Sequence, residues 1–149
     1  MSQSIEISTA RERVDIDFVH RYLSEESYWA EAIPRETVVR SIDHSMPFTV
    51  FEDGQPIAFA RVVTDYATFG YLADVFVAAS HRGRGIAKML MAFILRHPEL
   101  QGLRRWHLVT RDAQPLYSQF GFTPLDVPER HMMIVNRGVY ERKDETVES

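Results

Sequence analysis

The stretch from Tyr71 to Lys88 has the sequence YLADVFVAASHRGRGIAK, which joins an apolar strand to a glycine-containing turn and the start of a helix. Residues 71–77 are apolar except for Asp74, a pattern typical of a central strand that is buried on both faces. From about Arg84 to Arg96, apolar side chains recur at helical spacing. The stretch therefore predicts a helix that begins at the carboxyl end of a strand, where open α/β sheets tend to bind ligands.

The turn between this strand and this helix has the composition of an anion site. Gly83 and Gly85 allow the backbone to approach a ligand closely, and the unpaired amides of a first helical turn favour negative charge. Arg82, Arg84 and Lys88 add positive charge around the same turn. A diphosphate is the expected ligand, although the two glycines alone are equally compatible with a turn that only ends the strand.

Two common nucleotide motifs do not fit the turn. It lacks the glycine spacing and the Gly-Lys-Ser/Thr ending of an ATPase phosphate loop. Read as a dinucleotide motif, it has Lys88 where a third Gly or Ala should stand, and no acidic residue ends the next strand to bind a ribose. A phosphate ligand of another kind is expected.

The rest of the chain predicts an α/β or α+β fold. Asp15 can cap a helix with an apolar stripe at Ile16, Val19 and Leu23, and a second short helix should follow Pro34. Asp53-Gly54 between two apolar runs predicts a tight hairpin, because glycine accepts a positive φ at little cost. The other expected elements are strands at Phe48–Glu52, Ile57–Val63, Arg105–Val109 and Met132–Val135, and a helix at Gln114–Phe120, capped by Asp112 and closed at Gly121.

Length and composition indicate one domain spanning residues 1–149, with a charged segment at 137–149 that is expected to fray. Of the 149 residues, 45% are hydrophobic and 26% charged, as in ordinary globular domains. With Cys 0, thiolate metal sites and thiol catalysis are excluded, and we predict no metal site. The start of the chain shows no secretory signal, and no apolar run is long enough to span a bilayer, so we expect a cytoplasmic protein without a membrane partner.

Two segments together resemble a known enzyme family. The run Arg82-Gly83-Arg84-Gly85-Ile86-Ala87 resembles the acyl-coenzyme A motif of the GNAT superfamily of N-acetyltransferases, Gln/Arg-x-x-Gly-x-Gly/Ala. The sequence AQPLYSQFGF at residues 113–122 is similar to the family's Ala-x-x-Leu-Tyr-x-x-x-Gly-Phe helix. The order of the two motifs and the strand between them make coincidence improbable, and the likeness covers about Phe48 to Val135.

The resemblance implies a mixed, mainly antiparallel sheet of about six to seven strands, with a splayed parallel pair at the cofactor site and flanking helices. It implies acetyl-CoA or coenzyme A as the cofactor. The residues expected to bind it are Val75, Phe76, Val77, Arg82, Gly83, Arg84, Gly85, Ile86, Ala87, Lys88 and Tyr117. Many relatives have an asparagine that contacts the pantetheine arm where this chain has Asp112, so helix capping is the expected role of Asp112.

The resemblance implies that an amine attacks the thioester directly. Tyr117 is then the expected general acid for the departing thiolate, although a tyrosine here could also only pack at the helix end. Asp74 is the first candidate for the general base, with a purely structural carboxylate at a strand irregularity as the alternative. His107 is the second candidate, because histidine exchanges protons near neutral pH.

The acceptor is the least determined part of the prediction. Tyr28 and Trp29, with acidic neighbours, could form a wall that attracts a cationic amine, or could simply cover the sheet. Asp65 and Tyr66, in the loop before the central strand, are equally plausible. A small-molecule or peptide amine is expected, and polyamines, amino acids, aminoglycosides and peptide termini all remain open.

An acetyl-CoA-dependent N-acetyltransferase is therefore the expected function. The alternative is a non-catalytic module that binds acyl-CoA without a competent acceptor site. A sheet-based nucleic-acid binder is disfavoured by the formal net charge of −4, because such proteins neutralise phosphates with Lys and Arg. A strand edge near the carboxyl terminus could also pair two chains as a homodimer.

Overall fold

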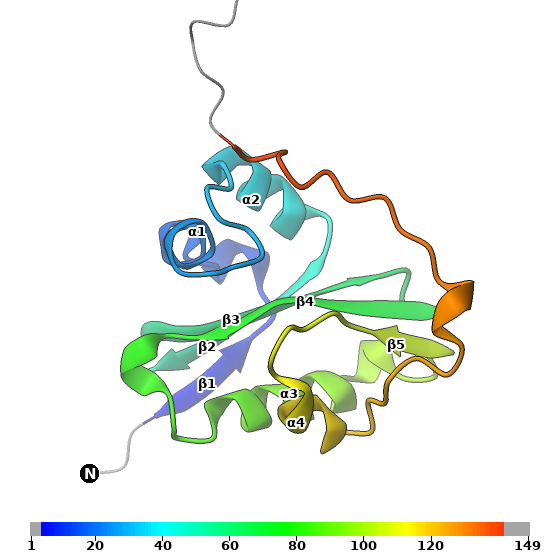
Figure 1. The fold of residues 1–149 in the computed structure, drawn as a ribbon. Coiled ribbons are helices and arrows are strands. Elements are labelled where there is room, and N and C mark those ends of the chain that lie inside the picture. The colour runs from blue at the N-terminus through cyan, green and yellow to red at the C-terminus, as the bar shows by residue number, and fades with distance from the viewer. Residues whose placement is uncertain (1–3, 142–149) are drawn as a thin grey trace, which may run out of the picture.

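One mixed sheet organises residues 4–141, the part of the chain that the computed structural model describes (Figure 1). Its strands are β1 (Ile5–Ser8), β2 (Met46–Glu52), β3 (Gln55–Thr64), β4 (Phe69–Val77) and β5 (Arg105–His107), side by side in that order. The pairs from β1 to β4 are antiparallel, and β4 pairs with β5 in parallel. A mainly antiparallel sheet with one parallel pair is therefore confirmed, but the predicted six to seven strands is wrong, since the described residues form 5.

The strand predicted at Met132–Val135 is not present in the structure. Residues 132–135 have no regular secondary structure, and within the described part of the chain no strand pairs with them. A strand needs a neighbour to satisfy its backbone groups, so β-propensity alone does not create one. The strand predicted at Arg105–Val109 is present in shorter form as β5.

Helices cover both faces of the sheet, as Figure 1 shows with α1 and α2 on one side and α3 and α4 on the other. The helices are α1 (Ile16–Glu25), α2 (Arg35–Asp43), α3 (Ile86–Arg96) and α4 (Gln114–Ser118), with short 3-10 helices at Arg11–Arg13, Ala79–His81, Pro98–Leu100 and Pro128–Arg130. None of the helices within residues 4–141 has the length and apolarity required to cross a bilayer.

The core is divided by the sheet into two apolar layers. Leu90 and Ile94 of α3 pack with side chains of β2 and β3 such as Phe48. On the opposite face, Val19 and Leu23 of α1 pack with α2 and with side chains of β3 and β4. The amphipathic stripes predicted for these helices therefore face the sheet, and their burial is the main contribution that holds the layers together.

Two local signals in the sequence produce the predicted geometry. The Asp15 carboxylate accepts a hydrogen bond of 3.0 Å from the Phe18 amide and so caps α1. The β2–β3 hairpin turns at Asp53 and Gly54, which have φ values of 49° and 84°. Gly54 adopts this left-handed conformation without strain, and Asp tolerates it better than most residues.

The cap predicted for α4 is wrong. Ala113, rather than Asp112, occupies the N-cap position, and its amide donates to Thr110 Oγ1 over 3.1 Å. Asp112 is exposed, and its carboxylate lies 4.0 Å from Arg111. Thr110 precedes Ala113 by three residues, so its hydroxyl reaches the Ala113 amide, which has no hydrogen-bond acceptor within the helix.

The terminal segment predicted to fray, 137–149, is only partly described. Residues 142–149 lie outside the described part of the chain. Tyr140 is half-buried against the apolar layer between α1, α2 and the sheet. The described end of the chain is therefore attached to the fold through Tyr140.

A β-bulge in β4 sets the position of the functional site. Arg61 of β3 lies opposite Ala73, whereas Phe59 lies opposite Phe76, so β4 contains one extra residue in between. Asp74 takes up this irregularity with a φ of 55°. Bulges bend a strand and redirect its side chains, which accounts for a carboxylate in an otherwise apolar strand.

Candidate functional site

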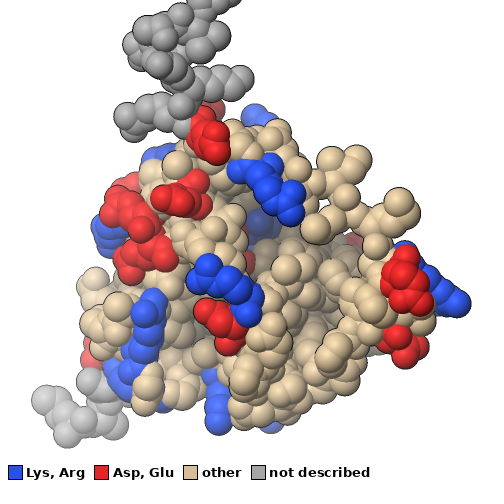
Figure 2. Space-filling model, in the orientation of Figure 1, with Lys and Arg blue, Asp and Glu red and all other residues tan. Residues whose placement is uncertain are grey.

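A cavity of about 650 Å³ opens beside the bulge in β4. Its lining comes from the α1 end and the following loop, from β3 and β4, from residues 108–113, and from α4. The paired residues of β4 and β5 end at Tyr71 and His107, although β4 continues to Val77. The two parallel strands therefore separate next to the cavity, and Figure 2 shows this face of the molecule hollowed near its centre.

The glycine turn between β4 and α3 leaves space for a ligand. Gly83 and Gly85 have φ values of 78° and 77°, and Gly85 is the N-cap of α3. A Cβ added at either glycine would meet no atom within 4 Å. The backbone of the turn is therefore open on its outer side, as an anion bound by the first-turn amides requires.

Arg82 connects this turn to the cavity. Its Nε donates to the Val77 carbonyl at 3.2 Å, and its Nη2 donates to the Tyr22 hydroxyl at 2.8 Å. Both Arg82 and Tyr22 line the cavity. The guanidinium thus lies between the end of β4 and α1, while Lys88 is exposed on the first turn of α3.

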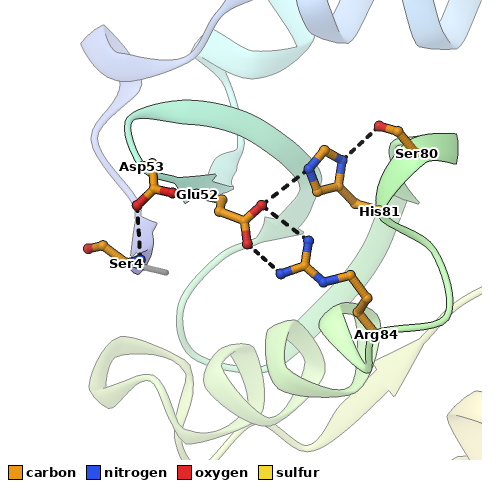
Figure 3. Close-up of polar contacts among 6 residues, drawn as sticks. All are labelled: Ser4, Glu52, Asp53, Ser80, His81 and Arg84. Carbon is orange, nitrogen blue, oxygen red and sulfur yellow. Dashed lines mark hydrogen bonds and ion pairs between the residues drawn. The ribbon is translucent and has the colours of Figure 1, made fainter. Parts of the chain in front are cut away.

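Arg84 is held by a residue that sequence reasoning missed. Glu52, at the end of β2, is only 8% exposed, and both of its carboxylate oxygens accept hydrogen bonds from Arg84 (Figure 3). Oε1 of Glu52 also lies 3.2 Å from Nε2 of His81, whose Nδ1 is 2.8 Å from the Ser80 hydroxyl. The hydrogen bond from Arg84 is the main reason why the pKa of Glu52 lies below its usual value. Glu52 therefore ties both ends of the glycine turn to the β2–β3 hairpin.

Asp74 is enclosed by two side chains from other parts of the chain. Its Oδ1 accepts a hydrogen bond of 2.8 Å from Trp29 Nε1, and its Oδ2 accepts one of 2.6 Å from Arg61 Nε. The Asp74 side chain is 10% exposed and the Arg61 side chain 19%. The carboxylate lines the cavity as an ion-paired group, and both of its hydrogen bonds come from side chains.

Tyr117 brings a neutral phenol to the same cavity. It lies on α4 and is 8% exposed. Burial, and secondarily the nearby Tyr28, raises the pKa of Tyr117 to about 12. The hydroxyl therefore keeps its proton at neutral pH and can donate a hydrogen bond into the cavity.

Of the two residue pairs suggested for the acceptor site, only one lies at the cavity. Tyr28 and Trp29 line the cavity. The Tyr28 hydroxyl accepts a hydrogen bond of 2.8 Å from the Arg111 amide, and the Arg111 guanidinium lies 3.8 Å from the centre of the Tyr28 ring. This wall of the cavity is thus built from two segments far apart in sequence.

Asp65, Tyr66 and His107 are not among the residues that line the cavity. Asp65 instead accepts hydrogen bonds from the amides of residues 67–69 and from the Thr68 hydroxyl, and these bonds hold its pKa far below the usual value. His107 lies with its ring 5.8 Å from that of Tyr71 and stacked at 6.2 Å on that of His131. The structure therefore brings Asp74 and Tyr117 together in one cavity and leaves His107 outside it.

Several lining residues had no role in the sequence prediction. They include Tyr22, Arg61, Tyr71, Thr110 and Tyr140. One signal was present, because Arg61 is the single charged residue in the run at 57–63, just as Asp74 is in the run at 71–77. Opposite charges in two neighbouring apolar strands predict an ion pair, which the register confirms.

The chain is similar in sequence and fold to several known proteins. A crystal structure from Xanthomonas campestris pv. campestris, described as belonging to the GNAT family of acetyltransferases, shares 49% sequence identity, with a TM-score of 0.91 over 93% of this chain and 98% of that one. A Gibberella zeae protein described as a candidate acetyltransferase is 25% identical over 135 residues, which cover 76% of this chain and 75% of that protein. A candidate acetyltransferase from Clostridium acetobutylicum, crystallised with acetyl-CoA, has the same fold at 16% identity, with a TM-score of 0.67 over 91% of this chain and 96% of that one.

The family model of the acetyltransferase (GNAT) family matches residues 16–122. This range runs from the first residue of α1 to just past α4 and so contains the glycine turn, the bulge of β4 and Tyr117. The chain belongs to the GNAT family of acetyltransferases.

Proposed function

We propose that the protein transfers the acetyl group of acetyl-CoA to a primary amine by direct attack. The observation that carries this proposal is that a buried, protonated tyrosine and an ion-paired carboxylate line one cavity, beside a glycine turn that is open to an anion. Tyr117 and Asp74 are the two polar groups of the cavity to which we assign chemistry, and Gly83 and Gly85 supply the turn.

The open turn suits the diphosphate of the acyl donor. The amides at residues 83–88 and the positive end of α3 would bind its oxygens, with Arg82 and Lys88 contributing charge. Each such charge contributes about 0.3–1 kcal/mol when exposed, so several must act together. Because Arg84 is bound to Glu52, its main contribution in this proposal is to hold the shape of the turn.

The separation of β4 from β5 suits the pantetheine arm. The paired residues of the two strands end at Tyr71 and His107, so the β4 backbone at Val75–Val77 faces the gap without a β5 partner among the described residues. An amide of this segment can donate to the thioester oxygen and stabilise the charge that develops on it.

The chemical step forms a bond between the amine nitrogen and the acetyl carbon and breaks the carbon–sulfur bond. An alkyl amine with a pKa near 10.4 must first lose a proton, at a cost of about 4–5 kcal/mol at pH 7. In our proposal Asp74 receives this proton directly or through water, and its bonds to Trp29 and Arg61 fix its orientation. Tyr117 donates its phenolic proton to the departing thiolate, and the proton that the nitrogen loses as the amide forms returns to the tyrosinate, which restores the phenol.

The acceptor would enter along the wall formed by Tyr28 and Trp29. Aromatic faces attract cationic groups, and Asp74 hydrogen-bonded to Trp29 adds negative charge at the same place. Glu26 lies on the same lining. These contacts support an acceptor that arrives as an ammonium ion.

Release of free thiol from acetyl-CoA, measured with a panel of amines, tests the proposal. We expect Tyr117→Phe to lower kcat by about 10²-fold or more, the range for loss of a general acid, with little change in the KM for acetyl-CoA. Tyr66→Phe is the matched control, because Tyr66 is exposed and lies away from the cavity lining, and it should leave kcat unchanged. Coenzyme A binding without thiol release from any amine would instead identify a non-catalytic acyl-CoA-binding module.

A further inference from the structure

Arg61 brings more hydrogen-bond donors to the cavity than its ion pair uses. A guanidinium group carries five N–H donors, and the contact with Asp74 uses only the one on Nε. Within residues 4–141, nothing accepts a hydrogen bond from the terminal nitrogens of Arg61, Nη1 and Nη2. Arg61 lines the cavity, and its side chain is only 19% exposed. The terminal nitrogens are therefore available to an acceptor group on a ligand that enters the cavity.

The Arg61–Asp74 pair presents two opposite charges to the same cavity. Arg61 Nε lies 2.6 Å from Asp74 Oδ2, and both side chains belong to the lining. Because the two charges partly cancel, a ligand with one positive charge gains less from the pair than from a lone carboxylate. A second ammonium group, as in a diamine, would be repelled by the Arg61 guanidinium. A ligand that carries an ammonium and a carboxylate close together can place each group beside the opposite charge, so the pair favours a zwitterion.

Tyr71 adds a hydroxyl group beside these two charges. It lies on β4, is half-buried and lines the cavity. Burial and, secondarily, the charge of Asp74 raise the pKa of Tyr71, whereas the charge of Arg61 lowers it. The phenol therefore lies within electrostatic reach of both members of the pair and keeps its proton at neutral pH. Its O–H can donate a hydrogen bond to a carboxylate that is bound by Arg61.

The cavity wall on the α1–α2 side of the sheet is apolar. Ala30 and Ile33, in the loop between α1 and α2, are buried and line the cavity. Tyr22 of α1 also lines it, with its ring packed against the same apolar layer. Arg61 faces this side of the sheet, because it lies two residues along β3 from Phe59, which belongs to that layer. An apolar side chain of the ligand can therefore pack next to the charged pair.

We propose that the acceptor is a free amino acid with an apolar side chain, whose carboxylate is bound by Nη1 and Nη2 of Arg61 and by the Tyr71 hydroxyl, and whose α-ammonium group lies beside Asp74. The inference rests on the proposed acetyl transfer and names the substrate class. The α-nitrogen bonds to the acetyl carbon as the carbon–sulfur bond breaks, and the carboxylate is unchanged. Asp74 takes one proton of the ammonium group and passes it to water, and the thiol takes another through Tyr117. The product is an N-acetyl amino acid.

Amines that differ only at the carboxyl carbon test the substrate class on the natural chain. The probes are L-leucine and L-phenylalanine, their amides, and the decarboxylated amines isoamylamine and phenethylamine. Each amide keeps the size of the acid and mimics a peptide terminus, but it carries no negative charge. We expect kcat/KM for thiol release from acetyl-CoA to be about 10- to 100-fold higher with at least one of the two acids than with its amide or amine, the range for hydrogen bonds to a charged group. Equal values, or higher values with the amides or amines, would overturn the proposal.

Arg61→Met tests whether Arg61 selects the carboxylate. The variant also removes a partner of Asp74, so the acid and the amide should both react more slowly, but the ratio of their kcat/KM values should fall to near one. A purely structural role would lower both values and keep the ratio. Arg13→Met is the matched control, because Arg13 is ion-paired with Glu6 outside the cavity lining, and it should keep the ratio of the natural chain. An unchanged ratio in Arg61→Met would overturn the proposal.

Calorimetry separates the amino acid site from the acetyl transfer itself. The same acids and amides are titrated into the natural chain with coenzyme A present, a measurement that needs no turnover. Tighter binding of an acid than of its amide, with no thiol release from any amine, would reject acetyl transfer and support the amino acid site. Thiol release from amines, with equal binding of acids and amides, would support acetyl transfer and reject the amino acid site.

Discussion

At the scale of single residues, Glu52 shows how a distant carboxylate can shape a ligand-binding turn. It is buried at the end of β2, yet its partners Arg84 and His81 belong to the turn before α3. A buried carboxylate requires such partners, because leaving it unpaired is costly. The conformation of the turn thus depends on a charge pair that spans more than thirty residues of sequence.

We predict that Glu52→Gln weakens acyl-CoA binding by loosening this turn. The variant keeps the size of the side chain but loses its charge, so the KM for acetyl-CoA should rise several-fold while the kcat at saturation changes little. Glu6→Gln is the control, because Glu6 is exposed and its ion pair with Arg13 lies on β1. An unchanged KM would show that Glu52 does not position the turn.

The lowered pKa of Glu52 predicts a dependence of stability on acid. A carboxyl group whose pKa is lower in the folded state stabilises the fold above its unfolded value, near 4.5, and loses this contribution as the pH falls through the lower folded value. The free energy of unfolding should therefore fall more steeply below pH 4.5 in the natural chain than in Glu52→Gln. Urea titrations at several pH values measure the difference, and parallel curves would contradict it.

The raised pKa of Tyr117 makes a prediction for alkaline conditions. Because its folded pKa is about 12, against 10.0 for an unperturbed tyrosine, the phenol stays protonated well above neutral pH. We expect kcat to keep rising up to about pH 10, as the amine with its pKa near 10.4 loses its proton, and to show no decline in this range. A decline with a midpoint below pH 10 that disappears in Tyr117→Phe would show that the tyrosine ionises earlier than burial predicts.

At the scale of elements, the bulge in β4 brings together groups that the sequence separates. The extra residue in β4 turns Asp74 towards Arg61 of β3 and Trp29 of the loop after α1. The separation of β4 from β5 begins on the same strand, so one element supplies both the carboxylate and the gap.

We predict that Arg61→Met lowers the free energy of unfolding by about 1–3 kcal/mol, because it leaves a largely buried carboxylate without its cation and with one hydrogen bond fewer. Adding Asp74→Asn should recover part of this loss, since asparagine tolerates the positive φ at this position and carries no charge. Chemical denaturation of both single variants and the double variant measures the coupling. If the loss of free energy in the double variant equals the sum of the losses in the two single variants, the Arg61–Asp74 pair has no interaction energy.

The elements that could be predicted from the sequence are those with local signals. Asp15 caps α1, Asp53-Gly54 turns the hairpin, and the spacing of Gly83 and Gly85 marks the start of α3, each through bonds or dihedral angles within a few residues. Residues 132–135 have the apolar character of a strand, but pairing depends on a neighbour that local sequence does not specify.

At the scale of the whole molecule, the candidate site depends on pairs that no local pattern contains. The Glu52–Arg84 and Arg61–Asp74 contacts join residues 32 and 13 positions apart, so they follow from the topology of the sheet. Asp65 illustrates the converse, because a carboxylate placed near the site by its position in sequence is used to close its own loop. The family could be identified from two short motifs, whereas cavity walls such as Tyr22, Arg61 and Tyr140 could be identified only from the fold.

Calorimetry of coenzyme A binding shows whether the glycine turn before α3 binds the diphosphate of an acyl carrier. Gly85→Trp fills the open side of the turn, and Gly102→Trp is its matched control, with a φ of 78° against 77° and equally open surroundings elsewhere in the fold. We predict that the natural chain and Gly102→Trp bind coenzyme A with similar Kd, and that Gly85→Trp weakens binding by about two orders of magnitude, close to 2.7 kcal/mol. An unchanged Kd in folded Gly85→Trp would contradict the placement of the acyl carrier and the roles assigned around it.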